Sequence, residues 1–521
     1  MSGNNVEFAA LTYAIYKLGA VLVPLNPSFN ASQVIAALRL LGVKVLIISA
    51  ITDLAYKPGF GRSNESLLSE VLTELSAGTA HNGTENTLDA VIVIDNTHNH
   101  PNETFTYPQS ERVVMYESLL HGTERSPDLP LDLDANDTAT IQFTSGTTSS
   151  PKAAMLSHRS ILNNALFIAQ RMGMESFDRV VVPPPLFHCF GSVLGYLAVA
   201  ATGATILFPS PAFDPRATVE MCCKYNATGL YGVTTMMLAV LDSLPECGTP
   251  TSLRKGIVAG STVPEALMQR IYDKLGLEDL VICYGMTETS PVSCMTSPFD
   301  PFEKRCSSVG RPMPHTLVKI VNPLNRSRVM PINKPGELAI SGYLVMKGYY
   351  GNQEQTDAVR VMEPNGPVTT AWMYSGDEAI MDENGYVSIT GRIKDLIIRG
   401  GENVHPLEIE NCLLQLPGIM EAAVVGIPDD RLGETICAFI ILHRGWNFSQ
   451  ECGTINTSDV FDETTEYQVS KHAIQRWIRV KLSSHLVPKA IFHVGELPKT
   501  ASGKVQKFVL RQWASDMNKA S

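Results

Sequence analysis

Short apolar segments alternate with helical patterns up to about residue 290, and this alternation restricts the possible folds more than any other feature of the chain. The apolar segments have the length of buried strands: 43–48, 90–95, 138–143, 205–208, 229–233, 256–259 and 280–283. Helical patterns at 157–172 and 264–275 lie between some of them. Unbroken apolar strands joined by helices are typical of a parallel sheet covered on both faces. We therefore predict an α/β fold whose ligands bind at loops beyond the carboxyl ends of the strands.

The pattern changes farther along the chain. Residues 312–389 show shorter strands, Gly/Pro turns and few helices, which indicates a small β-rich subdomain at about 312–390. A shorter α/β pattern follows, with helices at 407–416 and 469–482, strands at 422–427 and 436–442, and a polar surface loop at 447–466. We therefore predict a large N-terminal domain of parallel α/β subdomains plus the β-rich subdomain, residues 1–391, and a smaller C-terminal α+β domain, residues 396–521.

Composition excludes several classes of protein. The formal charge of −11 argues against a nucleic-acid partner. Ten cysteines without a C-x-x-C pair indicate neither a zinc cluster nor a disulfide framework, and they favour a reducing compartment.

Targeting signals are not apparent. The first residues predict an amphipathic helix whose core face carries Leu11, Ala14, Ile15 and Leu18, and they do not resemble a secretion signal. The longest apolar region, 193–208, is shorter than the roughly 20 residues that a transmembrane helix needs, and the C-terminus is not S-K-L. We expect a cytoplasmic protein without a transmembrane segment, and import into an organelle stays open.

Residues 144–152 read TSGTTSSPK and directly follow the apolar segment 138–143. A strand that leads into small hydroxylated residues offers backbone N–H groups, hydroxyl donors and one ammonium to a polyphosphate. The pattern GxxxxGK[ST] is absent, and an ordinary surface turn is the alternative interpretation of this stretch taken alone.

Four further segments carry polar groups near turns: YGMTET at 284–289, YSGD at 374–377, GRIKD at 391–395 leading into IRGGEN at 398–403, and PKTASGK at 498–504. Each segment taken singly also fits a solvated turn. Together, and in this order, they resemble the adenylate-forming superfamily of acyl- and aryl-CoA synthetases, luciferases and stand-alone adenylation domains. The likeness runs from about Val6 to Arg511. The segments PPLFHCFGS at 184–192, SVGRPMPH at 308–315 and DLIIRGGEN at 395–403 are similar to the medium-chain acyl-CoA synthetase branch.

The resemblance implies a site for ATP. The β- and γ-phosphates would be held by the residues of the hydroxyl-rich loop: Thr144, Ser145, Gly146, Thr147, Thr148 and Lys152. Tyr284, followed by Gly285, would stack on adenine, with Gly260 and Ser261 along the base. Asp377 would accept the two ribose hydroxyls, with Arg392 beside it.

The resemblance also implies catalytic residues and a moving domain. Thr287 would touch the α-phosphate, Glu288 would ligate Mg²⁺, and Lys504 would bridge the acyl carboxylate and the α-phosphate. Gly400 and Gly401 would line the tunnel for coenzyme A. A hinge at 392–395, with Lys394 at its pivot, would let a mobile C-terminal domain rotate between the two half-reactions.

An acyl pocket is the least specific expectation. His188 lies in an apolar loop and is read equally well as a core histidine or as a substrate contact. Phe187, Val193, Tyr231 and Met286 could form apolar walls around it, although such residues more often belong to the core. The amino-acid-activating branch carries an aspartate near the position of His188, and its absence favours a plain carboxylic acid.

The chain departs from the family pattern in two ways. Ser149 and Ala153 stand where the family usually has glycine, which predicts slower or weaker use of ATP. The family also usually has some tens of residues before the segment that matches 4–8, including its first strands. Their absence would leave an exposed sheet edge in the N-terminal subdomain.

The predicted function is that of an ATP- and Mg²⁺-dependent acyl-CoA ligase that activates a carboxylic acid, fatty or related, and passes it to coenzyme A. A carboxylate must attack an anionic α-phosphate, so cations are needed and a general base is not. One alternative is an enzyme that loads a carrier-protein thiol. Another is a non-catalytic nucleotide-binding relic, which the presence of Glu288, Asp377, Arg392 and Lys504 disfavours.

Overall fold

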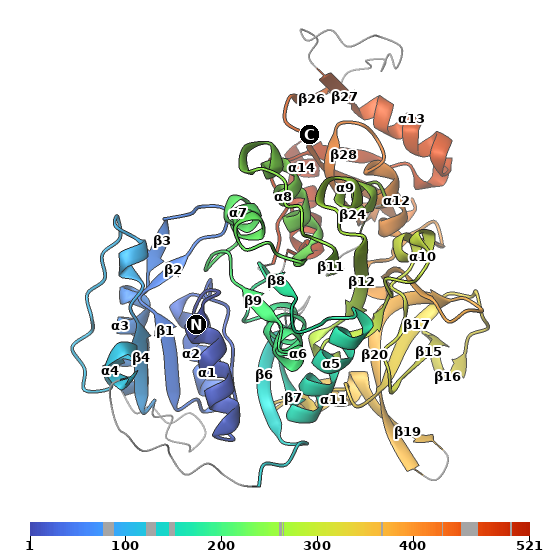
Figure 1. Ribbon diagram of the computed structural model, residues 1–521. Coiled ribbons are helices and arrows are strands. Elements are labelled where there is room, and N and C mark those ends of the chain that lie inside the picture. Colours follow the sequence, from blue (N-terminus) through green and yellow to red (C-terminus); the bar gives the residue numbers. More distant parts are fainter. Residues whose placement is uncertain are drawn as a thin grey trace.

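The computed structural model describes residues 1–76, 88–120, 132–144, 152–259, 263, 265–365, 368–429, 431–449, 467–500 and 503–520. Figure 1 shows a large lobe, coloured blue to yellow, and a smaller lobe of orange and red elements at one end of it. This mixed α/β architecture with a large N-terminal and a smaller C-terminal part is the predicted fold class. Ser145, Gly146, Thr147, Thr148, Gly260 and Ser261 lie outside the described residues.

A seven-stranded sheet forms the centre of the large lobe. Its order is β14-β13-β12-β11-β10-β8-β9, and it is parallel from β9 to β12. The strands are β8 (Arg179–Val181), β9 (Thr205–Leu207), β10 (Gly229–Val233), β11 (Lys255–Ala259), β12 (Asp279–Gly285), β13 (Val292–Met295) and β14 (Arg311–Pro312). Helices α7 (Pro215–Lys224), α8 (Thr234–Cys247) and α9 (Glu265–Leu275) bury one hydrophobic cluster against it. A second cluster includes α5 (His158–Arg171) and the π-helix η2 (Phe190–Leu197). The sheet is therefore covered on both faces, as continuous apolar strands require.

A smaller parallel sheet, β1-β4-β5, lies at the N-terminal side of the large lobe (Figure 1). It consists of β1 (Val45–Ser49), β4 (Ala90–Ile94) and β5 (Val113–Met115), with α2 (Ala31–Leu41), α3 (Glu65–Ser76) and α4 (Tyr116–Leu120) nearby and a hairpin of β2 (Ile51–Asp53) and β3 (Gly61–Ser63). Helix α2 begins at an Asn30–Gln33 capping box and ends at Gly42, whose φ of 60° suits glycine.

The strand that precedes the hydroxyl-rich loop does not belong to either parallel sheet. β6 (Thr138–Thr144) pairs antiparallel with β7 (Lys152–Ser157), and β18 (Gly348–Tyr349) pairs antiparallel with the other edge of β7. The expectation of a parallel strand was wrong here. The connection 145–151 is too short for a crossover, which takes about a dozen residues, whereas an antiparallel pair needs only a loop.

The β-rich part is an antiparallel sheet of order β16-β15-β17-β20-β19, with β21 paired to β20. Its strands are β15 (Thr316–Asn322), β16 (Asn325–Val329), β17 (Gly336–Gly342), β19 (Arg360–Asn365), β20 (Val368–Met381) and β21 (Val387–Arg392). Two short helices belong to this stretch of the chain: α10 (Phe302–Ser307) precedes β15, and α11 (Gln353–Val359) precedes β19.

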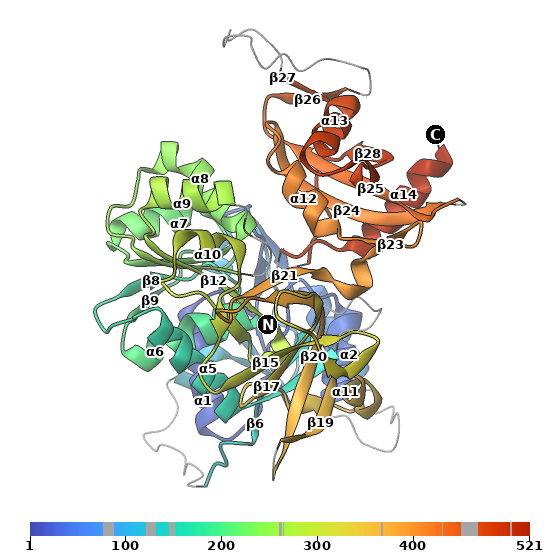
Figure 2. The ribbon, with the colours of Figure 1, turned by 90° about the vertical axis from the view of Figure 1, so that its right-hand side faces the viewer.

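The small lobe is built around a sheet of order β23-β22-β25-β24, with β28 parallel to β25. The strands are β22 (Ile397–Arg399), β23 (Glu402–Val404), β24 (Ile419–Asp429), β25 (Gly433–Leu442) and β28 (Ala490–His493). Helices α12 (Pro406–Leu413) and α13 (Lys471–Lys481) bury one face, and α14 (Lys507–Ala520) buries the other. Figure 2 shows this lobe beside the end of β21, where the short helix η4 (Ile393–Asp395) connects the lobes. The guanidinium of Arg511 in α14 lies 2.9 Å from Oδ1 of Asp395.

Part of the expected polar loop at 447–466 is a strand. β26 (Trp446–Ser449) pairs in parallel with β27 (Tyr467–Ser470), and the rings of Trp446 and Tyr467 stack with centroids 5.0 Å apart. This aromatic contact stabilises a pairing that polar composition alone does not predict. Residues 450–466 lie outside the described residues.

Helix α1 (Val6–Lys17) forms, but it turns another face inward than expected. Phe8 and Thr12 are buried, whereas Ala14 is exposed and Leu18 is 49% exposed. Thr12 accepts a hydrogen bond from the Tyr196 hydroxyl at 3.3 Å, and its own hydroxyl donates to the carbonyl of Phe8. Phe8 belongs to the central hydrophobic cluster and Tyr16 packs against it, so the face with these aromatic side chains is the one that turns inward. Within the described part of the chain, no helix is both long and apolar enough to cross a membrane.

Candidate functional site

The turn that carries Lys504 lies against the large lobe. The turn is closed by a bridge between Lys499 and Val505 and by a 2.8 Å hydrogen bond from the amide of Thr500 to the carbonyl of Lys504. Gly503 adopts a φ of +82°, and a Cβ there would lie 3.4 Å from Cγ2 of Val233, the last residue of β10. Glycine thus allows the turn to approach the carboxyl end of a central strand.

Charged groups that sequence analysis predicted for one site influence the ammonium of Lys504. Burial and the Arg392 guanidinium lower the pKa of Lys504, whereas the carboxylates of Asp377 and Glu288 favour its charged form. Residues from both lobes therefore meet around this lysine.

Asp377 and Arg392 lie opposite each other on β20 and β21. Nε of Arg392 is 3.1 Å from Oδ1 of Asp377, and the Tyr284 hydroxyl donates to Oδ2 at 2.5 Å. Burial and the neighbouring Asp377 carboxylate raise the pKa of Tyr284 well above its usual value, so the phenol stays a donor. Gly285 follows at a point where a Cβ would lie 1.7 Å from the carbonyl oxygen of Pro291, so only glycine fits.

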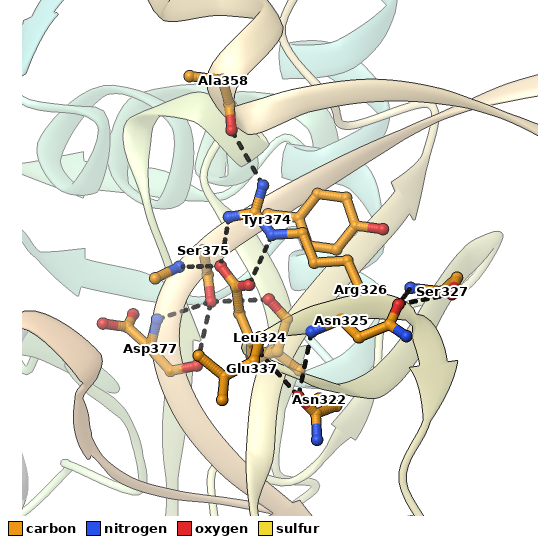
Figure 3. A network of polar contacts seen from close by, with 12 residues as sticks. Asn322, Leu324, Asn325, Arg326, Ser327, Glu337, Ala358, Tyr374, Ser375 and Asp377 are labelled. Atoms are coloured by element: carbon orange, nitrogen blue, oxygen red, sulfur yellow. Dashed lines mark hydrogen bonds and ion pairs between the residues drawn. The ribbon is translucent and has the colours of Figure 1, made fainter.

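A polar network fixes the turn before Asp377 (Figure 3). The carboxylate of Glu337, 3% exposed, accepts two hydrogen bonds from Arg326 at 2.9 and 3.1 Å and one from the amide of Gly376 at 3.2 Å. The Ser375 hydroxyl accepts from the amide of Asp377 and donates to the carbonyl of Leu338. The guanidinium of Arg326 also lies over the ring of Tyr374. This network orients the Asp377 side chain toward Tyr284 and Arg392.

Thr287 and Glu288 lie in the short helix η3 (Thr287–Thr289), just beyond the carboxyl end of β12. Oε1 of Glu288 accepts a 2.8 Å hydrogen bond from the Tyr349 hydroxyl. Oγ1 of Thr287 is 3.8 Å from Sγ of Cys189. The site thus has a carboxylate and a hydroxyl next to the end of a parallel strand.

Thr144 and Lys152 are paired across β6 and β7, at the two ends of the segment that lies outside the described residues. The ammonium of Lys152 lies 5.0 Å from the centre of the Tyr349 ring. Lys152 is therefore near Glu288 through a shared neighbour.

His188 and Cys189 line the same region. Burial and the positive charge of Lys504 lower the pKa of His188 to about 4, so its imidazole is neutral near pH 7. Burial raises the pKa of the Cys189 thiol to about 11. Both groups are uncharged at neutral pH.

The other residues expected at an acyl pocket divide into two groups. Phe187 and Met286 are half-buried and pack on the core cluster that also contains Cys189. Val193 and Tyr231 are 1% exposed, and the Tyr231 hydroxyl contacts the sulfur of Met172 at 3.3 Å. The latter two are thus enclosed in the core in this arrangement.

Gly400, Gly401 and Lys394 do not join the cluster around Lys504. The two glycines form the exposed turn between β22 and β23, with φ values of 62° and 86°, and Lys394 is exposed in η4. They lie on the small lobe and its connection.

Sequence reasoning missed Tyr349, Cys189 and the Glu337–Arg326 pair. The glycine-flanked pair Gly348-Tyr-Tyr-Gly351 was a signal for a constrained aromatic residue. Nothing in the sequence pairs Tyr349 with Glu288, because the two residues are 61 positions apart.

Family models match most of the chain. The model described as AMP-binding enzyme matches residues 1–350, and the model of the AMP-binding enzyme C-terminal domain matches residues 408–504.

Curated relatives are similar over nearly the whole chain. Acyl-CoA ligase sidI of Aspergillus fumigatus is 38% identical over 99% of this chain and 82% of its own length. Medium-chain acyl-CoA ligase ACSF2, mitochondrial, of Mus musculus is 35% identical over 98% of this chain and 77% of its own length.

Solved structures share the fold. ATP-bound MatB from Rhodopseudomonas palustris gives a TM-score of 0.75 at 23% identity, covering 99% of this chain and 88% of that one. MenE from Bacillus subtilis, in complex with the intermediate OSB-AMP, gives 0.73 at 23% identity, covering 98% and 86%. At this identity the likeness concerns the fold alone.

Proposed function

Because the chain belongs to the AMP-binding enzyme family, we propose that it is an AMP-forming acyl-CoA ligase. It would use ATP to convert a carboxylic acid to an acyl-adenylate and then form the thioester with coenzyme A. The observation that carries this proposal is the approach of the Lys504 turn to the carboxyl end of β10, where the charges of Arg392, Asp377 and Glu288 act on the lysine.

The nucleoside would bind at Asp377. Its carboxylate, held by Arg392 and Tyr284, is an acceptor suited to two ribose hydroxyls, and the Tyr284 ring with Gly285 would border the adenine. Thr144 and Lys152 would hold the phosphates together with Ser145, Gly146, Thr147 and Thr148, and Gly260 and Ser261 would line the base. This assignment follows the family pattern residue by residue.

Mg²⁺ would bind at Glu288. In the described residues, no group of three or more His, Cys, Asp or Glu side chains could hold a metal ion by itself. A single carboxylate nevertheless fits Mg²⁺, which is commonly held by one or two carboxylates together with substrate phosphates and water. When bound, the ion would neutralise charge on the phosphates.

The first half-reaction needs charge neutralisation more than it needs a base. A carboxylate oxygen of the acid would attack the α-phosphorus, the bond to the pyrophosphate oxygen would break, and pyrophosphate would leave. Lys504 would donate to both the carboxylate and the α-phosphate, and Thr287 would donate to the α-phosphate. Burial of the lysine increases the strength of these contacts.

The second half-reaction would use the other face of the small lobe. The sulfur of coenzyme A would attack the acyl carbonyl and AMP would leave with its oxygen. Gly400 and Gly401 would line the thiol path after a rotation about Lys394 within 392–395. Their distance from Lys504 in sequence and their exposed turn support separate use of the two faces.

The acid is proposed to be a plain carboxylic acid of the medium-chain or related class. His188 is neutral, and Phe187 and Met286 are half-buried and apolar, so none of the three offers a charge to a second polar group of the acid. Val193 and Tyr231 would contact the part of the acyl chain that is farthest from the carboxylate. ACSF2 relatives carry the medium-chain name. The cytoplasmic location stays a prediction.

Release of pyrophosphate and AMP with acids of several lengths tests the proposal. We expect ATP consumption that depends on both the acid and coenzyme A. Thioester formation with free coenzyme A separates this enzyme from one that loads a carrier protein. An absence of acid-dependent pyrophosphate exchange into ATP, across the whole series of acids, would contradict the function.

A further inference from the structure

Tyr349 lies where two functional segments of the large lobe are joined by the backbone. The amide of Met346 donates to the carbonyl of Glu288 at 2.9 Å, and the amide of Tyr350 donates to the carbonyl of Ala153 at 2.8 Å. Between these bonds, β18 pairs with β7 so that Tyr349 lies opposite Ala154. The segment 346–350 therefore connects η3 with the strand that begins at Lys152.

The conformation of this segment is fixed independently of the site. The amide of Tyr349 donates to Oγ1 of Thr356 at 2.9 Å. Gly348 has a φ of +149°, and a Cβ there would lie 2.9 Å from Cγ2 of Thr356. A glycine is required at this position, and Thr356 holds the backbone that carries Tyr349.

The Tyr349 side chain contacts both charged groups at once. It is 5% exposed, its hydroxyl donates to Oε1 of Glu288 at 2.8 Å, and the ammonium of Lys152 lies over its ring at 5.0 Å. No ion pair joins Lys152 to Glu288 among the residues that the structure describes. The tyrosine thus contacts the ammonium through the face of its ring and the carboxylate through its hydroxyl.

We propose that Tyr349 is a positioning residue that prepares Glu288 for Mg²⁺ and Lys152 for the phosphates. This inference rests on the proposed function of both residues. The hydroxyl would hold the carboxylate through Oε1 and leave Oε2 for the ion, and the ring would hold the ammonium of Lys152 through a cation–π contact. Partners of this kind, one shell beyond a metal ligand, typically contribute about 10–100-fold to metal affinity.

Two substitutions separate the two effects. Tyr349→Phe removes the hydroxyl and keeps the ring, whereas Tyr349→Ala removes both. Tyr343→Phe is the matched control, because Tyr343 lies six positions earlier and its hydroxyl accepts a hydrogen bond from Nδ2 of Asn164, at 3.2 Å, and not from a residue of the proposed site.

Calorimetry of ATP binding, with saturating Mg²⁺ and with EDTA, gives a readout that does not depend on turnover. For Tyr349→Phe we expect the affinity for ATP in the presence of Mg²⁺ to fall by about tenfold, and the Mg²⁺ concentration that gives half of the effect on ATP binding, the Mg²⁺ midpoint, to rise by a similar factor. ATP binding in EDTA and the KM for coenzyme A should stay within about twofold of the parent. High Mg²⁺ should restore adenylation in this variant. Tyr349→Ala should also weaken metal-free ATP binding, because the ammonium of Lys152 then loses the ring that holds it.

The results distinguish the inference from its premise. If the parent chain binds no ATP, the proposed function fails and this inference fails with it. If the parent binds ATP and Tyr349→Phe has the Mg²⁺ midpoint of the parent and of Tyr343→Phe, the role of Tyr349 is overturned while the function stands. Melting curves show whether each variant folds. The comparison of Tyr349→Phe with Tyr343→Phe tests the role of Tyr349 even where Tyr349→Ala does not fold.

Discussion

The hydroxyl of Tyr284 donates a 2.5 Å hydrogen bond to Oδ2 of Asp377, and this bond joins the central seven-stranded sheet to the antiparallel β-rich sheet. Two separately built sheets thus meet at one carboxylate. A ligand that contacts Asp377 contacts the boundary between them, and the Arg392 end of β21 is part of the same contact.

Asp377→Asn should weaken ATP binding by about tenfold or more, because a charged acceptor contributes more to a hydrogen bond than a neutral amide does. Calorimetry with ATP measures the change. Asp382→Asn is the control, since Asp382 forms a surface pair with Lys304 at 2.8 Å. Equal ATP affinities in the two variants would remove Asp377 from the nucleotide site.

Lys504→Ala should slow adenylation by about 10²–10³-fold, because it removes a donor aimed at developing charge. Thioester formation from a supplied acyl-adenylate should change by less than about threefold, since that step does not use this donor. Lys499→Ala is the control in the same turn, where Lys499 pairs with Glu421 at 2.6 Å. A similar loss in both half-reactions would indicate a general disruption instead.

Asp178→Asn should destabilise the large lobe by about 3 kcal/mol, because it leaves the ammonium of Lys255 without the carboxylate at 2.6 Å and with the carbonyl of Gly173 beside it. Burial raises the pKa of Asp178, but hydrogen bonds from Lys255, the amide of Glu175 and Thr228 outweigh it and bring the pKa below its usual 3.8.

This stabilisation is present above the unfolded pKa and is lost as the pH falls through the lower folded value. Urea unfolding at neutral pH and near pH 3 should therefore show a smaller difference between parent and variant in acid. Asp279→Asn, at an exposed pair with Arg254, should change stability by less than about 1 kcal/mol. A difference for Asp178→Asn that is independent of pH would contradict the ionic explanation.

Ala153→Gly should not improve the use of ATP, although glycine is usual at this position in the family. Ala153 is 3% exposed within β7 and is not among the described residues with positive φ. Glycine should instead cost about 0.5–1 kcal/mol of stability. The KM for ATP and the melting temperature test this, and a clearly lower KM would show that the site needs glycine here.

The pattern of apolar segments predicted most of the strands because burial on both faces leaves a direct trace in composition. The segment 229–233 became β10 without a shift in its bounds, and the helix expected at 469–482 begins at 471 because Ser470 caps it. Strand direction was less predictable. β6 has the composition of a buried parallel strand, and only its partner determines that it runs antiparallel.

Long-range side-chain contacts were beyond the sequence. Glu288 and Asp377 were candidate residues because of their local motifs, yet the tyrosines that donate to them, Tyr349 and Tyr284, lie 61 and 93 positions away, so the sequence does not show the pairings. The inward face of α1 was also missed, because Phe8 and Tyr16 pack on the central cluster and the hydroxyl of Thr12 finds a partner in Tyr196.

Ion pairs bracket the connection between the lobes: Arg392 with Asp377 on one side and Asp395 with Arg511 on the other. While both hold, reorientation has only the backbone torsions of Ile393 and Lys394 to use. A rotation about these few bonds would carry the Lys504 turn along an arc whose length grows with its distance from the link, so a small change of torsion at two residues would be enough to withdraw the lysine.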